Sequence, residues 1–184
     1  NLKLPGESAG LVPTPEQNEI ARRATVSYGY GLQVTLAQLA QAYSVLGAGG
    51  VMHPLTLLKS TRDNALNSSS TNNVSVPFAK PAAKQVIKTS DALTIVDMMT
   101  SVTEPGGTAT LAAIDGYRVA GKTGTARRTN PKGGYYDDQY RTAFVGIAPA
   151  SNQRFVVAIM VEDPRVDKFG GLVAAPVFRS VMKE

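Results

Sequence analysis

The chain has 184 residues, of which 43% are hydrophobic and 18% charged, and its formal net charge is +5. This length and apolar content suit a single domain with a buried core and argue against disorder throughout the chain. The absence of cysteine excludes disulfides, thiol nucleophiles and cysteine-ligated zinc. The single histidine, His53, is interpreted as a surface or packing residue, so Ser-His-Asp catalysis is unsupported unless His53 itself serves.

The basic residues are scattered along the chain, apart from one tight cluster at Lys122, Arg127, Arg128 and Lys132. A nucleic-acid interface needs a basic face interleaved with aromatic residues, and the aromatics do not accompany this cluster. We therefore expect no nucleic-acid partner. No apolar run approaches the roughly 20 residues that span a bilayer, and no signal peptide is visible. No metal or organic cofactor is indicated.

The start of the chain, NLKLPGESAG, contains neither a methionine nor the beginning of a regular element. We interpret the chain as a fragment, or as one piece of a nicked chain. Residues 1–24 are rich in proline, glycine and polar residues, which predicts an extended surface segment. Residues 27–31, SYGYG, predict a tight loop with a structural role.

Two helices are predicted in the N-terminal half. The first begins with a capping box at Thr35 and Gln38 and ends at Gly47. Its apolar face consists of Leu36, Leu39, Ala40, Tyr43 and Leu46. The second covers about residues 89–103 and is terminated by Pro-Gly-Gly at 105–107.

Between these helices, residues 51–59 are expected to form a strand or extended segment broken by Pro54. The stretch at 63–73, DNALNSSSTNN, is polar and of low complexity. It predicts a flexible surface loop or insert over residues 62–84.

The C-terminal half changes to strand-like patterns. Residues 117–126, 140–148 and 154–161 predict three strands whose short separations suit hairpins, so the strands should be antiparallel. Residues 155–161 are continuously apolar, which is expected of a strand covered on both faces. A last helix is predicted over 172–183. The fold class is therefore α/β (α+β), with an antiparallel sheet packed between helices.

Residues 116–126, GYRVAGKTGTA, satisfy two functional patterns at once. Gly116, Gly121, Lys122 and Thr123 match G-x-x-x-x-G-K-[ST], the nucleotide-binding P-loop. Lys122, Thr123 and Gly124 also match K-T-G, the third signature of penicillin-recognising serine enzymes. The lysine would hold a phosphate in the first case and a carboxylate in the second.

The surroundings of the pattern disfavour a P-loop, which needs a flexible loop followed by a helix N-terminus. Residues 117–120 are strand-like, and nothing after Thr123 begins a helix. No apolar strand ending in aspartate follows to hold magnesium. We therefore interpret the P-loop match as accidental and keep nucleotide binding as the less favoured alternative.

The carboxylate interpretation fits a strand that lines a cleft. Lys122 would supply a fixed positive charge, and Thr123 and Thr125 would point to one face because side chains alternate along a strand. Gly124 would leave room for a close approach, and a strand N–H beyond it could donate to an oxyanion. The alternative from these residues alone is a surface strand with a lone lysine and two threonines.

Six segments occur along the chain in a fixed order: LPGESAG, SYGYG followed by VTLAQLAQAY, VTEPGGTA, GYRVAGKTGTARR, YRTAFVGIAPA and FGGLVAAPVF. Together they resemble the C-terminal part of the transpeptidase domain of class B penicillin-binding proteins, and most closely the division-specific penicillin-binding protein 3 type. The resemblance covers nearly the whole chain and is weakest at 63–84. It implies that residues 1–184 are the C-terminal portion of one penicillin-binding transpeptidase domain, incomplete in this chain.

The resemblance also implies an activity. Such enzymes cross-link peptidoglycan at the division septum. A serine attacks the D-Ala-D-Ala end of a stem peptide, D-alanine leaves, and an amine of a neighbouring strand takes up the acyl group. β-Lactams acylate the same serine. The implied location is the periplasmic side of the bacterial inner membrane, on an anchor that this chain lacks, with cell-division proteins as partners and no cofactor.

The K-T-G motif carries the implied site residues. Thr123 and Thr125 would bind the carboxylate of peptide or drug, beside Gly124. The backbone N–H of Thr125 would form half of the oxyanion hole. Lys122 would set the local electrostatic field and organise the neighbouring motif.

Other residues near the motif are open to two interpretations. Tyr140 and Phe169 would form an apolar wall beside the site, or they are ordinary core aromatics. Arg127 and Arg128 are solvated charges, or they steer an anionic substrate.

In the family the first two signatures, S-x-x-K and S-x-N, come before K-T-G, and the resemblance implies that both precede the start of this chain. Ser180–Lys183 matches S-x-x-K but lies after K-T-G, and 70–72, Ser-Thr-Asn, matches S-x-N within the polar loop. We take both as chance matches. The nucleophile is then absent from this chain, which should be inert without an N-terminal companion segment carrying both motifs. A non-catalytic module that binds peptides or β-lactams is the alternative.

Overall fold

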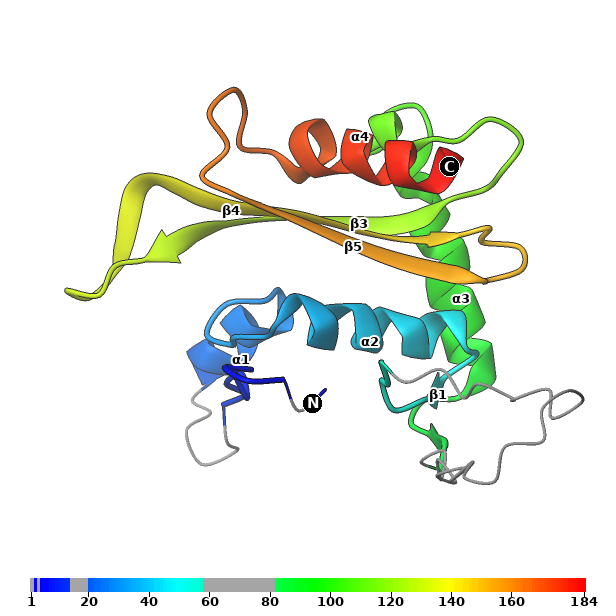
Figure 1. Cartoon of the computed structure of the whole chain (residues 1–184), viewed down its shortest axis with the longest axis horizontal. Coiled ribbons are helices and arrows are strands. Elements are labelled where there is room, and N and C mark those ends of the chain that lie inside the picture. The colour runs from blue at the N-terminus through cyan, green and yellow to red at the C-terminus, as the bar shows by residue number, and fades with distance from the viewer. Residues whose placement is uncertain (1, 3, 14–19, 58–81) are drawn as a thin grey trace, which may run out of the picture.

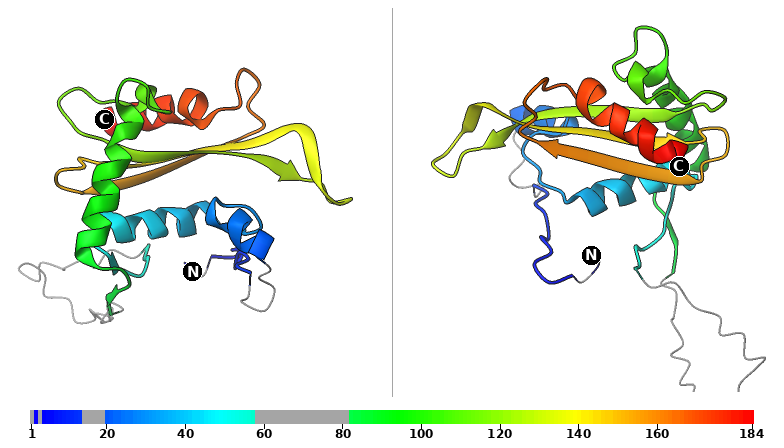
Figure 2. Two further views of the ribbon diagram at one scale, coloured as in Figure 1. Left: turned by 180° about the vertical axis from the view of Figure 1, so that it is seen from behind. Right: turned by 45° about the horizontal axis from the view of Figure 1, so that its top comes forward.

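The computed structural model describes residues 2, 4–13, 20–57 and 82–184 (Figure 1). An antiparallel sheet lies between helices, with α4 on one face and α2 on the other, and α3 crosses one end of the sheet (Figures 1 and 2). The strands adjoin in the order β3 (Ala120–Thr129), β4 (Tyr135–Ala148), β5 (Phe155–Glu162). The helices are α1 (Ile20–Ser27), α2 (Leu36–Gly47), α3 (Thr89–Met99) and α4 (Gly170–Lys183). The predicted α/β (α+β) class, a sheet packed between helices, is confirmed.

The predicted extended segment over residues 1–24 is wrong at its end, because α1 already begins at Ile20. The helix sequence, IARRATVS, contains alanine and arginine, which favour helical backbone. The Ser27 hydroxyl donates to the Ala24 carbonyl at 2.7 Å, which supports its structural role. The loop at 28–31 is tight as predicted, with both glycines at positive φ and its two tyrosine rings in edge contact.

Helix α2 begins with the predicted capping box. The Gln38 N–H donates to the Thr35 hydroxyl at 3.1 Å, and the Thr35 N–H donates to the Gln38 side-chain oxygen at 2.8 Å. The helix ends at Gly47, also as predicted. Burial raises the pKa of the Tyr43 phenol above its ordinary value, so this side chain stays neutral and contributes to packing.

The extended segment predicted at 51–59 contains the short strand β1 (Val51–Met52), which pairs antiparallel with β2 (Lys84–Gln85). The predicted flexible loop over 62–84 lies outside the described residues as far as residue 81. Its last residue belongs to β2, so the loop prediction is wrong there. The polar S-x-N match also falls outside the described residues.

The helix predicted at 89–103 is present in two parts. Helix α3 tightens after Met99 into a 3₁₀ turn, η2 (Thr100–Thr103), and a second turn, η3 (Thr110–Ala112), follows. Each helix among the described residues is too short or too polar to traverse a lipid bilayer.

Strand β4 is central, and its residues 144–148 are all buried, because β4 lies between the other two strands and helices cover both sides of it. The prediction that residues 155–161 form a strand covered on both faces is confirmed, since α2 and α4 both pack on β5. Strand β5 nevertheless lies at an edge of the three-stranded sheet, and Phe155 and Met160 are 57% and 40% exposed.

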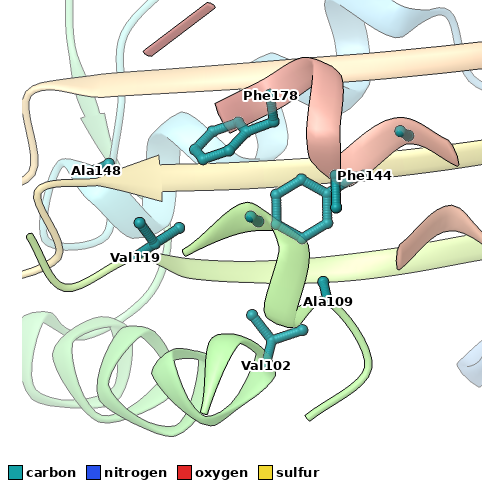
Figure 3. Close-up of a cluster of buried hydrophobic side chains, with 9 residues drawn as sticks. Val102, Ala109, Val119, Phe144, Ala148 and Phe178 are labelled. Carbon is teal, nitrogen blue, oxygen red and sulfur yellow. The ribbon is translucent and has the colours of Figure 1, made fainter. Parts of the chain in front are cut away.

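The largest apolar cluster fills the space between α4 and the sheet (Figure 3). It consists of Val102, Ala109, Ala112, Val119, Phe144, Ala148, Ala174, Ala175 and Phe178. The rings of Phe144 and Phe178 meet edge to face at 5.1 Å between centroids. Two glycines paired in register make room for them, because a Cβ on Gly121 would lie 2.5 Å from the Phe144 ring, and one on Gly146 would lie 2.4 Å from the Phe178 ring.

Helix α4 starts two glycines earlier than the predicted 172–183. A Cβ on Gly170 would lie 2.2 Å from the Ala143 carbonyl oxygen, and one on Gly171 would lie 1.8 Å from the Thr108 carbonyl oxygen. Only glycine allows this approach. The start of α4 therefore rests directly on the backbone of the sheet and on the loop after η2.

Candidate active site

The K-T-G residues Lys122–Gly124 lie within β3, not in a loop before a helix. A P-loop lysine requires a helix N-terminus at the phosphates, so the nucleotide-binding pattern at 116–123 is accidental. Among the described strands, β3 lies at the edge of the sheet opposite to β5 and pairs only with β4. In that pairing Lys122, Thr123, Gly124 and Thr125 face Val145, Phe144, Ala143 and Thr142, respectively.

The side chain of Lys122 is exposed. Its ammonium donates to the Thr123 carbonyl at 3.0 Å, a contact within its own strand. Among the described residues no carboxylate forms an ion pair with it. The positive charge of Lys122 is therefore available to an anionic ligand.

Thr123 and Thr125 lie on one face of β3, as predicted. They pair with Phe144 and Thr142, and both of these side chains face α4. The Thr123 hydroxyl lies 3.1 Å from the Thr108 hydroxyl, and the Thr125 hydroxyl donates to the Lys168 carbonyl at 3.3 Å. Each threonine thus has a partner in a loop next to the strand.

Gly124 has room for a Cβ without a clash. A Cβ there would lie 3.6 Å from the Ala143 Cβ, which is ordinary van der Waals contact. The carbonyl oxygen of Gly124 is close to the start of α4, 2.9 Å from the position of a Cβ on Gly170. No neighbouring group in the structure therefore requires glycine at 124.

Tyr140 and Phe169 lie around a cation. The Lys168 ammonium lies 5.0 Å from the centroid of the Tyr140 ring and 5.7 Å from that of Phe169. Both distances are typical of cation–π contacts. Phe169 is 55% exposed, so it is no core aromatic. The structure brings the two predicted aromatics together, with a lysine that gives this wall a positive charge.

The two arginines after the motif are tied to nearby carboxylates. Arg127 lies 3.7 Å from Asp137, and both side chains are largely exposed. Arg128 forms an ion pair with Asp163 and donates to Gln139 at 3.3 Å. These contacts favour the interpretation of both as charges of the solvated surface.

A cavity of about 340 Å³ opens between α3, η2 and the start of β3. It is lined by Ile95, Met98, Met99, Ser101, Val102, Gly107, Gly121 and Lys122. The surface beside Lys122 is thus mainly apolar on the α3 side.

The S-x-x-K match at the end of the chain lies on the exposed surface of α4. Ser180 is exposed on α4, and its hydroxyl donates to the Pro176 carbonyl at 3.1 Å. Lys183 is exposed near the end of the same helix. The Ser180 hydroxyl is therefore solvent-exposed and bonded to its own helix, with no hydrogen bond to Lys183, so nothing here activates it as a nucleophile.

No metal centre is present in the described part of the chain. His53 is exposed, and its carbonyl accepts a hydrogen bond from Gln41 at 3.2 Å. The described residues contain no group of three or more histidine, aspartate or glutamate side chains that could hold a metal ion.

Comparison with known proteins decides the family. Residues 1–183 match the family described as "Penicillin binding protein transpeptidase domain". The chain belongs to the penicillin-binding protein transpeptidase family. The resemblance to class B penicillin-binding proteins noted in the sequence is thereby confirmed.

Curated relatives carry the corresponding names. The chain is 40% identical to a "Probable peptidoglycan D,D-transpeptidase PenA" of Neisseria gonorrhoeae, over 97% of this chain and 28% of that protein. It is 40% identical to "Peptidoglycan D,D-transpeptidase FtsI" of Escherichia coli K12, over 99% of this chain and 28% of that protein. The chain thus spans less than a third of the length of these two relatives.

Solved penicillin-binding proteins have the same fold. The apo transpeptidase domain of penicillin-binding protein 3 from Burkholderia pseudomallei superposes with a TM-score of 0.82 at 36% identity, covering 100% of this chain and 51% of that one. Penicillin-binding protein 3 from Mycobacterium tuberculosis, complexed with aztreonam, gives a TM-score of 0.82 at 34% identity, covering 99% of this chain and 41% of that one.

Three residues near the K-T-G residues were not predicted as site residues from the sequence. The Thr108 hydroxyl contacts that of Thr123. The Lys168 carbonyl accepts from the hydroxyls of Thr125 and Thr142, and the Lys168 ammonium lies against the rings of Tyr140 and Phe169. Thr108 lies within the quoted segment VTEPGGTA and Thr142 within YRTAFVGIAPA, while Lys168 directly precedes FGGLVAAPVF. Thr142 looks like an ordinary residue of a β-strand, and only the pairing of β3 with β4 reveals its place.

The two glycines of β3 should behave differently when changed to alanine. Gly124→Ala should leave the melting temperature nearly unchanged, because the Cβ has room. If a ligand lies against the strand, the same change should slow penicillin acylation about tenfold or more, since one methyl group in a close contact costs about 1–3 kcal/mol. Gly121→Ala, which meets the Phe144 ring, should lower the melting temperature instead. Thermal unfolding and acylation rates test this, measured on both variants in an enzyme that also contains the serine-bearing companion segment. A destabilised Gly124→Ala with normal acylation would contradict it.

Proposed function

We propose that residues 1–184 are the C-terminal portion of a peptidoglycan D,D-transpeptidase domain and supply one wall of its active site. The observation that carries the proposal is the K-T-G strand itself. It lies at an edge of the sheet, with the Lys122 ammonium unpaired with any carboxylate of the described residues and two threonine hydroxyls on one face. The family and the names of the relatives support the same conclusion.

The wall fits a ligand that ends in a carboxylate. Lys122 gives the charge, and the hydroxyls of Thr123 and Thr125 give directional donors next to it. An extended peptide can lie antiparallel along an edge strand and use its unpaired backbone groups. In this proposal the C-terminal D-Ala-D-Ala of a stem peptide lies along β3 with its carboxylate at Lys122, Thr123 and Thr125. A β-lactam carboxylate occupies the same position.

The reaction follows from that placement. A serine oxygen forms an ester bond with the carbonyl carbon of the penultimate D-alanine, and the amide C–N bond breaks. The terminal D-alanine leaves as the free amine, which takes up a proton. The Thr125 N–H would donate to the oxyanion of the tetrahedral intermediate. An amine from a neighbouring stem peptide then displaces the serine and completes the cross-link.

The serine comes from outside residues 1–184 in this proposal. Ser180, the S-x-x-K match, is bonded to its own helix and exposed, which supports this assignment. We use "full enzyme" for these residues together with the companion segment that carries S-x-x-K and S-x-N. Its setting would be septal wall synthesis on the periplasmic side of the inner membrane, with cell-division proteins as partners. Tyr140 and Phe169 would line the site beside the carboxylate position.

Fluorescent penicillin tests the proposal on the full enzyme. We expect a label that survives a denaturing gel and that an excess of a peptide ending in D-Ala-D-Ala reduces. The matched control is the same peptide with its terminal carboxylate amidated, which should protect far less. Reversible binding without a covalent label would indicate a non-catalytic module and would contradict the proposal. So would stabilisation against heat that depends on nucleotide and magnesium.

A further inference from the structure

One backbone carbonyl next to the K-T-G strand accepts hydrogen bonds from two threonines. The Lys168 carbonyl accepts from the Thr125 hydroxyl at 3.3 Å, and it accepts from the Thr142 hydroxyl, which is closer. Thr125 and Thr142 are opposite each other in the register of β3 and β4, so their side chains lie side by side. Thr142 is fully buried, whereas Thr125 is exposed.

The position of this carbonyl is set by the start of α4. Phe169 is the N-cap of α4, so Lys168 is the last residue of the preceding loop. Gly170, without a Cβ, rests on the backbone oxygens of Ala143 and Gly124. The loop therefore meets the sheet where the two threonines are paired, and the carbonyl of Lys168 faces both hydroxyls.

The hydroxyls of Thr125 and Thr142 can have different roles. In the proposed function the Thr125 hydroxyl donates to a ligand carboxylate, and a hydroxyl has a single proton to donate. Binding of a ligand carboxylate therefore requires the Thr125 hydroxyl to break its hydrogen bond to the Lys168 carbonyl. The proton can turn about the Cβ–Oγ bond while the oxygen stays in place, so no backbone movement is needed. The free energy needed to turn the Thr125 hydroxyl away depends on whether the Lys168 carbonyl keeps another hydrogen-bond donor.

We infer that Thr142 is a positioning residue for Thr125. Its buried hydroxyl keeps the Lys168 carbonyl hydrogen-bonded, so that the Thr125 hydroxyl can turn to a substrate or β-lactam carboxylate without leaving that carbonyl unsatisfied. Without Thr142 the carbonyl competes with the ligand for the proton of Thr125. The inference rests on the proposed function, because it assigns Thr125 the role of carboxylate donor.

A double-mutant cycle on the full enzyme tests the inference. Thr142→Val keeps the shape and removes the hydroxyl, and we expect it to slow penicillin acylation about fivefold, the worth of one hydrogen bond. The loss should appear in the binding constant, with the first-order acylation step little changed. Thr125→Val alone should slow acylation about tenfold. Adding Thr142→Val to Thr125→Val should then slow it no further, because the competing donor is gone.

Two variants separate positioning from general damage. Thr142→Ser restores the hydroxyl and should recover the parent rate. Thr100→Val removes another buried threonine hydroxyl, one that donates to the Asp97 carbonyl at 2.7 Å, and should leave acylation unchanged. Melting temperatures of all variants identify any that fail to fold, and Thr142→Ser then carries the comparison.

Several results would overturn the inference. Thr142→Val could slow acylation by the same factor with and without Thr125, which is the mark of a merely structural role. A folded Thr142→Val that reacts at the parent rate would also overturn it. The proposed function is tested by a different result: it is contradicted if the parent enzyme is not labelled by penicillin at all. A labelled parent that is slowed by Thr125→Val, together with an uncoupled Thr142, leaves the proposed function standing and removes only this inference.

Discussion

Lys122→Ala in the full enzyme should lower the second-order rate constant of penicillin acylation about a hundredfold, because a charge-assisted hydrogen bond is worth about 1.5–3 kcal/mol. The ammonium has no carboxylate partner among the described residues, so the variant loses no internal ion pair. The melting temperature should therefore stay close to that of the parent. Stopped-flow or gel-based labelling measures the rate.

A methyl ester of the same penicillin makes the prediction specific to the carboxylate. The parent should prefer the free acid to the ester by a large factor, and Lys122→Ala should lose most of that preference. Lys132→Ala is the matched control, since it removes the same charge from the exposed turn between β3 and β4. It should change the rate less than about twofold at physiological salt, because exposed charges are screened. An acid preference that survives in Lys122→Ala would contradict the role given to this lysine.

Gly171→Ala should destabilise the protein by about 2 kcal/mol or more, although alanine favours helices over glycine by about 1 kcal/mol. The Cβ would lie 1.8 Å from the Thr108 carbonyl oxygen and 2.9 Å from its carbon, and both are backbone atoms that cannot turn aside. Either α4 or the loop after η2 must shift. Such a shift would also disturb the contact between Thr108 and Thr123, so acylation should slow in the fraction that folds.

Gly47→Ala is the matched control for this second prediction. Gly47 ends α2, and a Cβ there would make ordinary contacts at 3.6 Å with Gln153, Ile147 and Val156. Because the added methyl group meets no clash, the higher helix propensity of alanine should determine the result, and the variant should be as stable as the parent or more stable. Thermal or denaturant unfolding compares the two variants. A Gly171→Ala protein as stable as Gly47→Ala would mean that α4 does not rest on the Thr108 loop as described.

Local patterns predicted those parts of the fold that depend on neighbouring residues. The capping box at Thr35 and Gln38 needs only one turn of helix, and the structure has both of its hydrogen bonds. Alternation along a strand likewise placed Thr123 and Thr125 on one face. Helix α1 was missed because its polar sequence, IARRATVS, does not stand out from the polar segment before it.

Features that depend on strand order and on distant pairs could not be read from the sequence. The apolar run at 155–161 correctly indicated a covered strand, but nothing in that run shows that β5 lies at an edge of the sheet and β4 in its centre. The pairing of β1 with β2 joins segments on either side of the polar stretch at 63–73, and no hairpin-turn sequence between them predicts it. In the site, the K-T-G residues were predicted from their pattern. Lys168 and Thr142 reach that strand only through tertiary packing.

The site of acylation tests the central claim most directly. The full enzyme would be labelled with penicillin and digested, and the modified peptide identified by mass spectrometry. We expect the acyl group on a serine outside residues 1–184, with every peptide from this chain unmodified, since in the proposed function the K-T-G wall binds the drug but does not attack it. An acyl group on Ser180, or on any other hydroxyl of residues 1–184, would contradict the assignment of this chain as the wall without the nucleophile.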